Sequence, residues 1–188
     1  WSSDVCSSDL FTKELVKNEL PEGLIFYYPV LDSTGTKLRE LVQEGALEGT
    51  VVVAGKQTAG RGRLGRYWYS PAGGFYISVL FKPGEKFVGG FSLVAAGSVI
   101  KSLRDCGVER LSVKWPNDLF LVDKKVGGIL CENFTGNMMV GIGLNIFSRP
   151  IEWPADIAVK AGLIDLPGCN DRAAEILLPK LIGYLQIG

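Results

Sequence analysis

A segment rich in glycine and arginine, from Gly55 to Trp68, holds the side chains best suited to binding an anion. It contains no acidic residue, and its glycines and cations are Gly55, Gly60, Gly62 and Gly65 with Lys56, Arg61, Arg63 and Arg66. A helix is disfavoured because each interior glycine costs about 1 kcal/mol, and a buried strand is disfavoured because four cations would lose their water. Backbone N–H groups beside glycines and guanidinium forks bind phosphates and carboxylates. The segment therefore predicts an anion-binding surface loop, and a merely solvated basic loop is the alternative.

A second group of polar residues, Lys114 to Asp118, falls between two segments that are expected to be strands. Pro116 favours extended geometry at the residue before it, which fixes the directions of the flanking side chains. The Lys114 ammonium suits a phosphate or a carboxylate. The Asp118 carboxylate suits Mg²⁺, which proteins hold through one or two carboxylates together with substrate phosphates. A surface turn with a solvated lysine is the alternative.

Two further segments place glycines inside strand-like patterns: Lys125 to Leu130 (KVGGIL) and Gly141 to Asn145 (GIGLN). Glycines in a strand mark either a β-bulge or a place where a ligand comes close to the backbone. Together with the basic loop, these segments suit a site that joins two anions, such as a carboxylate and a nucleotide phosphate. Charge-assisted hydrogen bonds worth about 1.5–3 kcal/mol each would offset the repulsion, and alignment would remove about 7–11 kcal/mol of barrier.

The composition narrows the class of protein. The 188 residues are 47% apolar, carry a formal net charge of +0 and include no histidine. A basic loop within a neutral chain argues against general nucleic-acid binding, and the lack of histidine excludes histidine triads and histidine metal sites. Four cysteines without a CxxC pair indicate reduced thiols, and no apolar run reaches the roughly 18 residues of a membrane helix. We therefore expect a cytoplasmic protein that does not bind membranes.

Hydrophobic periodicity and turn residues supply the elements that must position these side chains. Strands are expected at residues 24–31, 49–54, 73–82, 111–115, 119–122, 125–132 and 138–146, and helices at 12–20, 37–44, 91–106 and 171–185. Alternate apolar residues from Phe75 to Phe81 should face one side of the sheet, and Asp32, Ser33 and Thr34 are N-cap candidates for the second helix. Short loops between consecutive strands indicate antiparallel neighbours, and helices packed on one face of the sheet would complete an α+β fold.

The order and spacing of these motifs resemble the catalytic domain of biotin–protein ligases, also named biotin–[acetyl-CoA-carboxylase] ligases. The matching motifs are Asp32–Thr34 (DST), Gln57–Trp68 (QTAGRGRLGRYW), Lys114–Asp118 (KWPND), Lys125–Leu130 (KVGGIL) and Gly141–Asn145 (GIGLN). They lie within residues 25–146, with a weaker tail beyond. The resemblance implies a fold like that of class II aminoacyl-tRNA synthetases and biotin ligases: α+β, with a mixed, mostly antiparallel sheet and helices packed on it.

The same resemblance implies an activity in two half-reactions. Biotin and ATP with Mg²⁺ would give biotinyl-5′-AMP and pyrophosphate. The biotinyl group would then pass to a lysine of a biotin carboxyl carrier protein, a subunit of acetyl-CoA carboxylase or of a related carboxylase. Lys114, Arg61 and Lys125 would be catalytic, Lys114 by steadying charge at the α-phosphate, and Asp118 would help to place Mg²⁺. Arg63 would lie in a loop that becomes ordered over the intermediate and retains it.

Substrate-binding roles are implied for a larger set. These residues would contact biotin, the nucleotide or the adenylate: Ser33, Thr34, Gly35, Gln57, Gly60, Arg61, Gly62, Arg63, Arg66, Trp68, Lys125, Gly127, Gly128, Ile129 and Asn145. Gly127, Gly128 and Ile129 would line the pocket for the biotin rings, and Asn145 would contact the nucleotide. Gly35 departs from the family pattern, which usually has asparagine after Ser-Thr, so one contact on the biotin side or at the helix cap is expected to differ.

The resemblance also leads to expectations about domain organisation. Residues 1–10, WSSDVCSSDL, lack an initiator methionine and the pattern of a signal peptide. We expect them to be a non-native or disordered leader, with residues 11–188 forming the catalytic domain. No winged-helix domain is expected before residue 25 and therefore no DNA binding, and the small C-terminal β-barrel domain of many relatives is expected to be missing. A homodimer is a further expectation, because some relatives pair through the edge of the sheet.

Three other functions stay open on the sequence. A lipoate or octanoate ligase or transferase of the same superfamily is the first, although GRGRLGR together with KWPND favours biotin. A truncated domain that binds biotin without full activity is the second. Nucleic-acid binding through the basic loop is the third, and the neutral net charge disfavours it.

Overall fold

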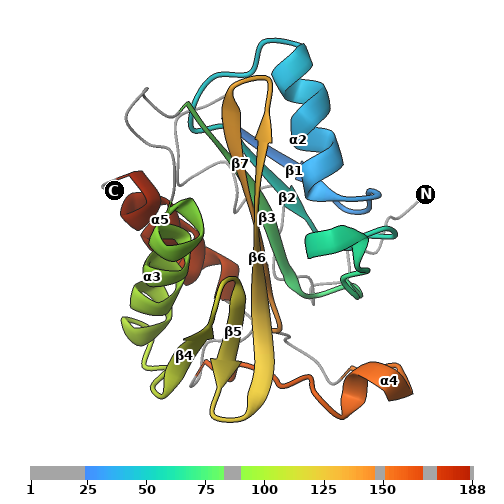
Figure 1. Cartoon of the computed structure of the whole chain (residues 1–188), viewed down its shortest axis with the longest axis vertical. Helices are drawn as coiled ribbons and strands as arrows, with labels where there is room; N and C mark the ends of the chain where they lie inside the picture. Colours follow the sequence, from blue (N-terminus) through green and yellow to red (C-terminus); the bar gives the residue numbers. More distant parts are fainter. Residues whose placement is uncertain (1–23, 83–89, 147–150, 167–172, 187–188) are drawn as a thin grey trace, which may run out of the picture.

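The computed structural model describes residues 24–82, 90–146, 151–166 and 173–186, and Figure 1 shows how their elements are arranged. Within these ranges, a seven-stranded sheet has the order β1-β2-β3-β7-β6-β5-β4. The strands are β1 (Ile25–Tyr28), β2 (Val51–Ala54), β3 (Phe75–Phe81), β4 (Leu111–Lys114), β5 (Asp118–Leu121), β6 (Lys124–Phe134) and β7 (Asn137–Leu144). The helices are α2 (Thr34–Gln43), α3 (Phe91–Arg104), α4 (Ala155–Ala158) and α5 (Ala173–Gln186). The helix predicted at residues 12–20 lies outside the described residues, and so does Asp171, the predicted first residue of the last helix.

The strand pairing is antiparallel everywhere in this sheet except between β1 and β2, which are parallel and are joined through α2. A parallel pair needs such a crossover, whereas β4 to β7 follow one another through short turns. The predicted α+β fold with a mixed, mostly antiparallel sheet is confirmed. β7 lies between β3 and β6. The strand that follows the basic loop, β3, is therefore next to β7 and close to β6, the two strands that contain the glycine motifs.

Helices cover both faces of the sheet. On one face, α3 and α5 pack over alternate residues of the central strands, among them Phe75, Ile77 and Val79. On the other face, Leu38 and Leu41 of α2 pack against Val52, Leu80 and Met139. The predicted orientation of the Phe75–Phe81 strand is confirmed. The expectation that helices lie on one face only is wrong, because α2 is the crossover of the parallel pair and packs on the opposite side (Figure 1).

Local boundaries follow the predicted signals with small shifts. Helix α2 begins at Thr34, three residues earlier than predicted, and Ser33 is its N-cap, with Ser33 Oγ accepting a hydrogen bond from the Thr36 backbone N–H at 3.1 Å. Asp118 belongs to β5, where it pairs with Lys114 of β4, so the turn between these strands begins and ends one residue earlier than expected. Of the residues from 155 to 165, only the four of α4 are helical.

The basic segment connects β2 to β3 and is a loop, as predicted. Its single 3-10 turn, Arg63–Gly65, has Leu64 in the left-handed region with φ 57°. The backbone N–H of Trp68 donates to the Gly60 carbonyl at 2.9 Å, so the segment doubles back on itself. Among the described residues, none of the helices combines the length and the apolar character that crossing a bilayer requires.

Candidate active site

A cavity of about 440 Å³ lies where the basic loop, the start of α2 and the β4–β5 corner meet β3, β6 and β7. Most of the predicted site residues line it: Ser33, Thr34, Gly35, Gln57, Arg61, Gly62, Arg63, Arg66, Trp68, Lys114, Asp118, Lys125, Gly128 and Ile129. These residues come from motifs that are up to about 95 positions apart in the chain. The predicted site requires Arg61 and Lys125 to lie in the same cavity, and both residues line this one.

The floor of this cavity is a chain of buried hydrogen bonds. Ser78 Oγ donates to Thr34 Oγ1 at 2.8 Å, and Thr34 donates to Gln57 Oε1 through its backbone N–H at 2.8 Å and its hydroxyl at 3.2 Å. Gln57 Nε2 then donates to Ser70 Oγ at 2.8 Å. Each of these polar groups has a partner before any ligand arrives, so the floor is rigid and its remaining lone pairs point in fixed directions.

Ser70 and Ser78 are members of this floor that the sequence patterns did not single out. Ser78 is 1% exposed and lies in β3, on the face opposite Ile77. A serine within an otherwise apolar strand is the signal that would have found it, because a buried hydroxyl needs a hydrogen-bond partner. Ser70 follows the basic loop and carries no comparable signal.

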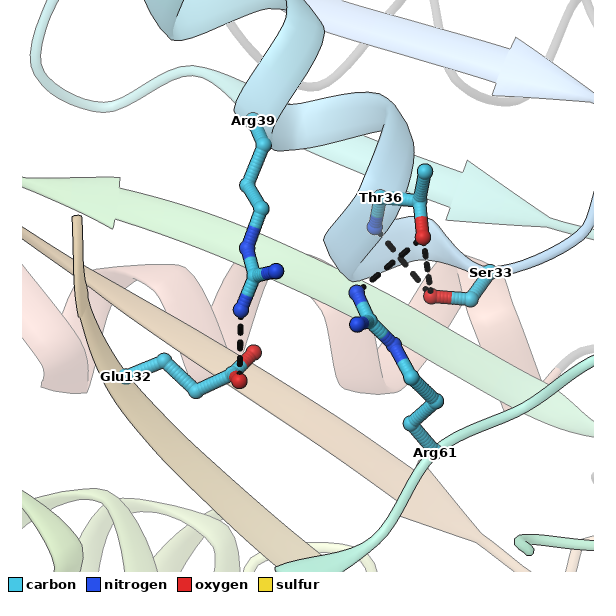
Figure 2. A network of polar contacts seen from close by, with 5 residues as sticks. All are labelled: Ser33, Thr36, Arg39, Arg61 and Glu132. Atoms are coloured by element: carbon cyan, nitrogen blue, oxygen red, sulfur yellow. Dashed lines mark hydrogen bonds and ion pairs between the residues drawn. The ribbon is translucent and has the colours of Figure 1, made fainter. Parts of the chain in front are cut away.

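Arg61 is held at the start of α2 (Figure 2). Its Nη2 donates to Thr36 Oγ1 at 3.0 Å, and Thr36 Oγ1 lies 3.4 Å from the Oγ of the N-cap Ser33. Beside this contact, Arg39 Nη2 of α2 pairs with Glu132 Oε1 of β6 at 2.6 Å. Glu132 also lines the cavity, and the sequence patterns did not indicate it.

Gly35 leaves a gap between these charged groups. A Cβ atom at this position would lie 3.7 Å from Ser33 Oγ, 3.8 Å from Glu132 Oε2 and 3.9 Å from Arg61 Nη2. These are ordinary contact distances, so the backbone would accept a small side chain here. The residue at which the sequence departs from the family pattern therefore faces the cavity, next to both an acidic and a basic group.

The β4–β5 corner forms the opposite wall. Lys114 and Asp118 face each other across the two strands, as the end pair of their register. Arg63 Nη1 of the basic loop donates to Asn117 Oδ1 at 3.2 Å, which joins the loop to the corner. Lys114 Nζ is exposed and lies 5.5 Å from the centroid of the Phe120 ring. The basic loop and the Lys114–Asp118 motif are thus in direct contact.

Lys125 is fixed more firmly than any other cation of the cavity. Its Nζ lies 2.8 Å from Asp118 Oδ1 and 5.3 Å from the centroid of the Trp68 ring. Its backbone N–H donates to the Lys160 carbonyl at 2.9 Å, and its carbonyl accepts from the Gly162 N–H at 2.8 Å. Strand pairing, an ion pair and an aromatic face therefore set the position of this ammonium group together.

Trp68 explains two of the strand glycines. A Cβ on Gly143 would lie 2.6 Å from Trp68 Nε1, and a Cβ on Gly128 would lie 3.3 Å from the indole ring. The glycines therefore let the indole lie flat on the sheet and form a wall of the cavity. A bulge is present as well: Leu119 pairs with Gly127 but Phe120 pairs with Lys125. The β-bulge interpretation is therefore correct, whereas the close approach of a ligand to the strand glycines stays a prediction, because the group next to Gly128 and Gly143 is Trp68.

Three predicted site residues do not line this cavity, and each has another local role. Gly127 faces the core, where a Cβ would lie 2.8 Å from Leu144 Cδ2, so the expectation that it lines the pocket is wrong. Gly60 is buried within the basic loop, where a Cβ would lie 2.5 Å from the Trp68 carbonyl oxygen. Asn145 lines a second, neighbouring cavity.

The second cavity, of about 190 Å³, shares Tyr67, Trp68 and Lys125 with the first. Its other walls are Tyr69, Asn145, Trp153, Asp156, Ile157, Lys160 and Ala161. Asn145 is buried, and its Nδ2 donates to the Gly162 carbonyl at 2.9 Å and to the Lys125 carbonyl at 3.3 Å. Asn145 therefore links the backbone of Lys125, a residue that lines both cavities, to the backbone of Gly162.

Asp118 is the residue predicted to place Mg²⁺. Its Oδ1 pairs with Lys125 and accepts from Asn117 Nδ2 at 3.0 Å. The described residues contain no group of three or more histidine, cysteine, aspartate or glutamate side chains that would hold a metal alone. A single carboxylate fits the way in which Mg²⁺ binds together with substrate phosphates, because the phosphates then supply most of the oxygen ligands.

Cys131, in β6, carries a free thiol beside Glu132. Burial raises the pKa of this thiol above its usual value. A raised pKa keeps the sulfur protonated near neutral pH, so Cys131 is not an activated nucleophile. The expectation of reduced thiols stays a prediction, and Cys6 and Cys169 lie outside the described residues.

Comparisons with known proteins agree on one family. A family model described as the Biotin/lipoate A/B protein ligase family matches residues 27–146. The bifunctional ligase/repressor BirA of Bacillus subtilis (strain 168) is 35% identical over 150 residues, which cover 76% of this chain and 46% of that protein. The biotin–[acetyl-CoA-carboxylase] ligase of Paracoccus denitrificans is 39% identical over 129 residues, which cover 63% of this chain and 53% of that protein.

A solved structure gives the same result for the fold. The biotin protein ligase from Aquifex aeolicus in complex with biotin and ATP matches with a TM-score of 0.71 and 32% identity, over 88% of this chain and 69% of that chain. The chain spans about half the length of the curated relatives it matches, 46% and 53% of the two described above.

Proposed function

The chain belongs to the biotin/lipoate A/B protein ligase family, and from that membership we propose that it joins biotin to a lysine of a carrier protein through a biotinyl-adenylate. The family model covers both biotin and lipoate ligases, and two of the relatives described above, from Paracoccus denitrificans and Aquifex aeolicus, are named for biotin. The family model matches residues 27–146, a range that contains the loop, the β4–β5 corner and the glycine-containing strands.

One observation carries this proposal: Lys125 stands at the boundary of two cavities that share it. The larger cavity has a floor of neutral hydrogen-bonding groups and a cationic rim, which suits a ligand with an amide-like head group and a carboxylate. The smaller cavity has aromatic walls, among them Trp68 and Trp153, and the Asn145 amide, which suits a nucleotide base. A carboxylate and an α-phosphate would then meet at Lys125.

In the first half-reaction, a carboxylate oxygen of biotin attacks the α-phosphorus of ATP, the phosphorus–oxygen bond to the β-phosphate breaks, and pyrophosphate leaves. Both reactants are anions, so the site must offset their repulsion. Lys125 and Lys114 neutralise charge at the meeting point, and Arg61 and Arg63 do so from the loop side. Donors that are fixed before the reaction stabilise charge in the transition state without reorganising, and Lys125 meets this condition best.

In the second half-reaction, the ε-amine of the acceptor lysine attacks the acyl carbon of the adenylate. An amide bond forms, the acyl–phosphate bond breaks, AMP leaves and the amine gives up a proton. Asp118 is held between Asn117 and Lys125 and keeps the Lys125 ammonium directed at the cavity. Mg²⁺, held by Asp118 and the phosphates, would supply further charge neutralisation on the triphosphate.

The acceptor is proposed to be a biotin carboxyl carrier domain of a carboxylase. The relative from Paracoccus denitrificans is named for the acetyl-CoA-carboxylase, which supports this choice. The expectations of a cytoplasmic location, of no DNA binding and of a homodimer stay predictions. So do the expected leader at residues 1–10 and the expected extent of the catalytic domain, residues 11–188.

The test is incubation of the chain with ATP, Mg²⁺ and either biotin or lipoate, with pyrophosphate release as the first measurement. Mass spectrometry of an added biotin carboxyl carrier domain is the second. Pyrophosphate release and a mass increase with biotin are expected. Release with lipoate instead would contradict the substrate, and biotin binding without release would identify a binding domain.

A further inference from the structure

The rim of the larger cavity carries large apolar side chains in contact with solvent. Leu64 is 88% exposed, Trp115 is 70% exposed and Tyr67 is 59% exposed, yet all three line the cavity. Residues that line a cavity while remaining this exposed form its open edge. Large apolar side chains gathered at the mouth of a site are a feature of surfaces that receive another protein.

Leu64 is unusual in its backbone as well as in its exposure. Its φ of 57° lies in the left-handed region, which a leucine rarely adopts because its Cβ approaches the neighbouring carbonyl. Glycine would adopt this conformation without strain, and the flanking Gly65 does so with φ 71°. The chain therefore holds a leucine outward at the tip of the loop, where neither its backbone nor its burial favours it.

Trp115 lines the same cavity as Leu64 and lies in the turn between β4 and β5, the segment that the loop contacts. The hydrogen bond from Arg63 Nη1 to Asn117 Oδ1, at 3.2 Å, ties the residue before Leu64 to the corner that carries Trp115. The two apolar side chains thus belong to segments that are linked at one point and flank one opening. Tryptophan is enriched among the residues that dominate protein–protein binding.

The charge of the rim indicates the character of the partner. Arg63, Arg66 and Lys114 are exposed and form no ion pair within the described part of the chain. The carboxylates that line the cavity there, Asp118 and Glu132, are already paired with Lys125 and Arg39. The mouth is therefore positive, and a protein surface that carries acidic residues beside an apolar one would complement it.

We propose that Leu64 and Trp115 form a docking surface for the acceptor protein, at the opening through which its lysine side chain enters. This inference rests on the proposed function. The ε-amine must reach an acyl carbon near Lys125, whereas the body of the acceptor is too large to enter a cavity of about 440 Å³. The acceptor therefore contacts the rim, and the exposed apolar groups of the rim are Leu64, Trp115 and Tyr67.

The experiment separates the two half-reactions in Leu64→Ala and Trp115→Ala variants. Adenylate formation is measured as pyrophosphate release without acceptor, and transfer is measured to a biotin carboxyl carrier domain and, separately, to hydroxylamine. We expect adenylate formation and transfer to hydroxylamine to stay within about twofold, and kcat/KM for the carrier domain to fall about tenfold, which corresponds to ~1.4 kcal/mol. Leu47→Ala is the matched control, because Leu47 is 65% exposed and lines neither cavity.

Two results would overturn the docking surface. One is carrier transfer that is unchanged in both variants, and the other is an equal fall in transfer to hydroxylamine, which would assign the residues to the chemistry. If the unsubstituted chain releases no pyrophosphate, the proposed function fails instead. In that case calorimetric binding of the carrier domain still decides the inference: weaker binding by Leu64→Ala than by Leu47→Ala supports it, and equal binding overturns it.

Discussion

The floor and the rim of the larger cavity differ in how their polar groups are satisfied. At the floor, Thr34, Gln57 and Ser78 are buried and bonded to one another. At the rim, Arg63 and Arg66 are exposed and form no ion pair within the described ranges. The floor is preorganised to form hydrogen bonds with a neutral group. The rim supplies positive charge that can neutralise a bound anion. Recognition and charge neutralisation thus belong to different parts of one site.

Lys125 belongs to neither region, because it is a cation that is both paired and half-buried. Substitution Lys125→Ala is expected to produce the largest effect, a fall of about 100- to 1000-fold in the rate of adenylate formation, because it removes a fixed positive charge from the meeting point. Pyrophosphate release under single-turnover conditions measures this. Lys37→Ala, which removes a lysine paired with Glu40 on α2, should leave the rate near the wild-type value. Wild-type kinetics for Lys125→Ala would remove the site assignment.

Arg63→Ala tests the rim. We expect faster escape of the biotinyl-adenylate, by about 10- to 100-fold, because one charge-assisted hydrogen bond contributes about 1.5–3 kcal/mol. The measurement is biotinylation of free lysine-rich protein that is not a carrier, which should increase as the intermediate leaks. Arg104→Ala, at the exposed end of α3, is the control. An unchanged rate of escape would show that the loop arginine does not retain the intermediate.

Gln57→Leu tests the floor. The substitution leaves the buried Thr34 N–H without its acceptor and removes the donor to Ser70 Oγ, which still donates to the Trp68 carbonyl. The expected loss is about 1–3 kcal/mol in the free energy of unfolding. Urea denaturation measures the loss, and calorimetry should show weaker biotin binding. Thr58→Ala removes an exposed hydroxyl nearby and should change neither quantity by much. Full stability in Gln57→Leu would mean that the buried chain of hydrogen bonds is not what holds the floor.

Thr36→Val gives the smallest expected effect and sharpens the boundary between the two regions. It removes the hydroxyl to which Arg61 Nη2 donates, while Ser33 still caps α2 (Figure 2). A lost hydrogen bond of about 0.5–1.5 kcal/mol corresponds to roughly a two- to tenfold rise in the KM for biotin. Thr36→Ser keeps the hydroxyl and should restore the wild-type KM. If Thr36→Ser and Thr36→Val behave alike, Arg61 does not depend on this contact.

Local features of the chain were predictable because they depend on near neighbours. The density of glycine and arginine in residues 55–68 excluded a helix, and the loop is present. Ser33 was one of the N-cap candidates because a short polar side chain before a helix satisfies a free backbone N–H, and it does so for Thr36, whereas Thr34 is the first residue of the helix. The alternation from Phe75 to Phe81 correctly indicated which residues of this strand share the face covered by α3 and α5, although both faces of the strand are buried.

The composition and motifs of the sequence by themselves determined the family, the basic loop and most of the residues that line the cavity. Only the tertiary structure decided that Gly127 faces the core while Gly128 lies under Trp68, that Asn145 belongs to a second cavity, and that Ser78 and Glu132 join the site. The reason is the strand order. β7 is inserted between β3 and β6, and such a pairing depends on the packing of distant segments, which short-range patterns in the chain do not encode.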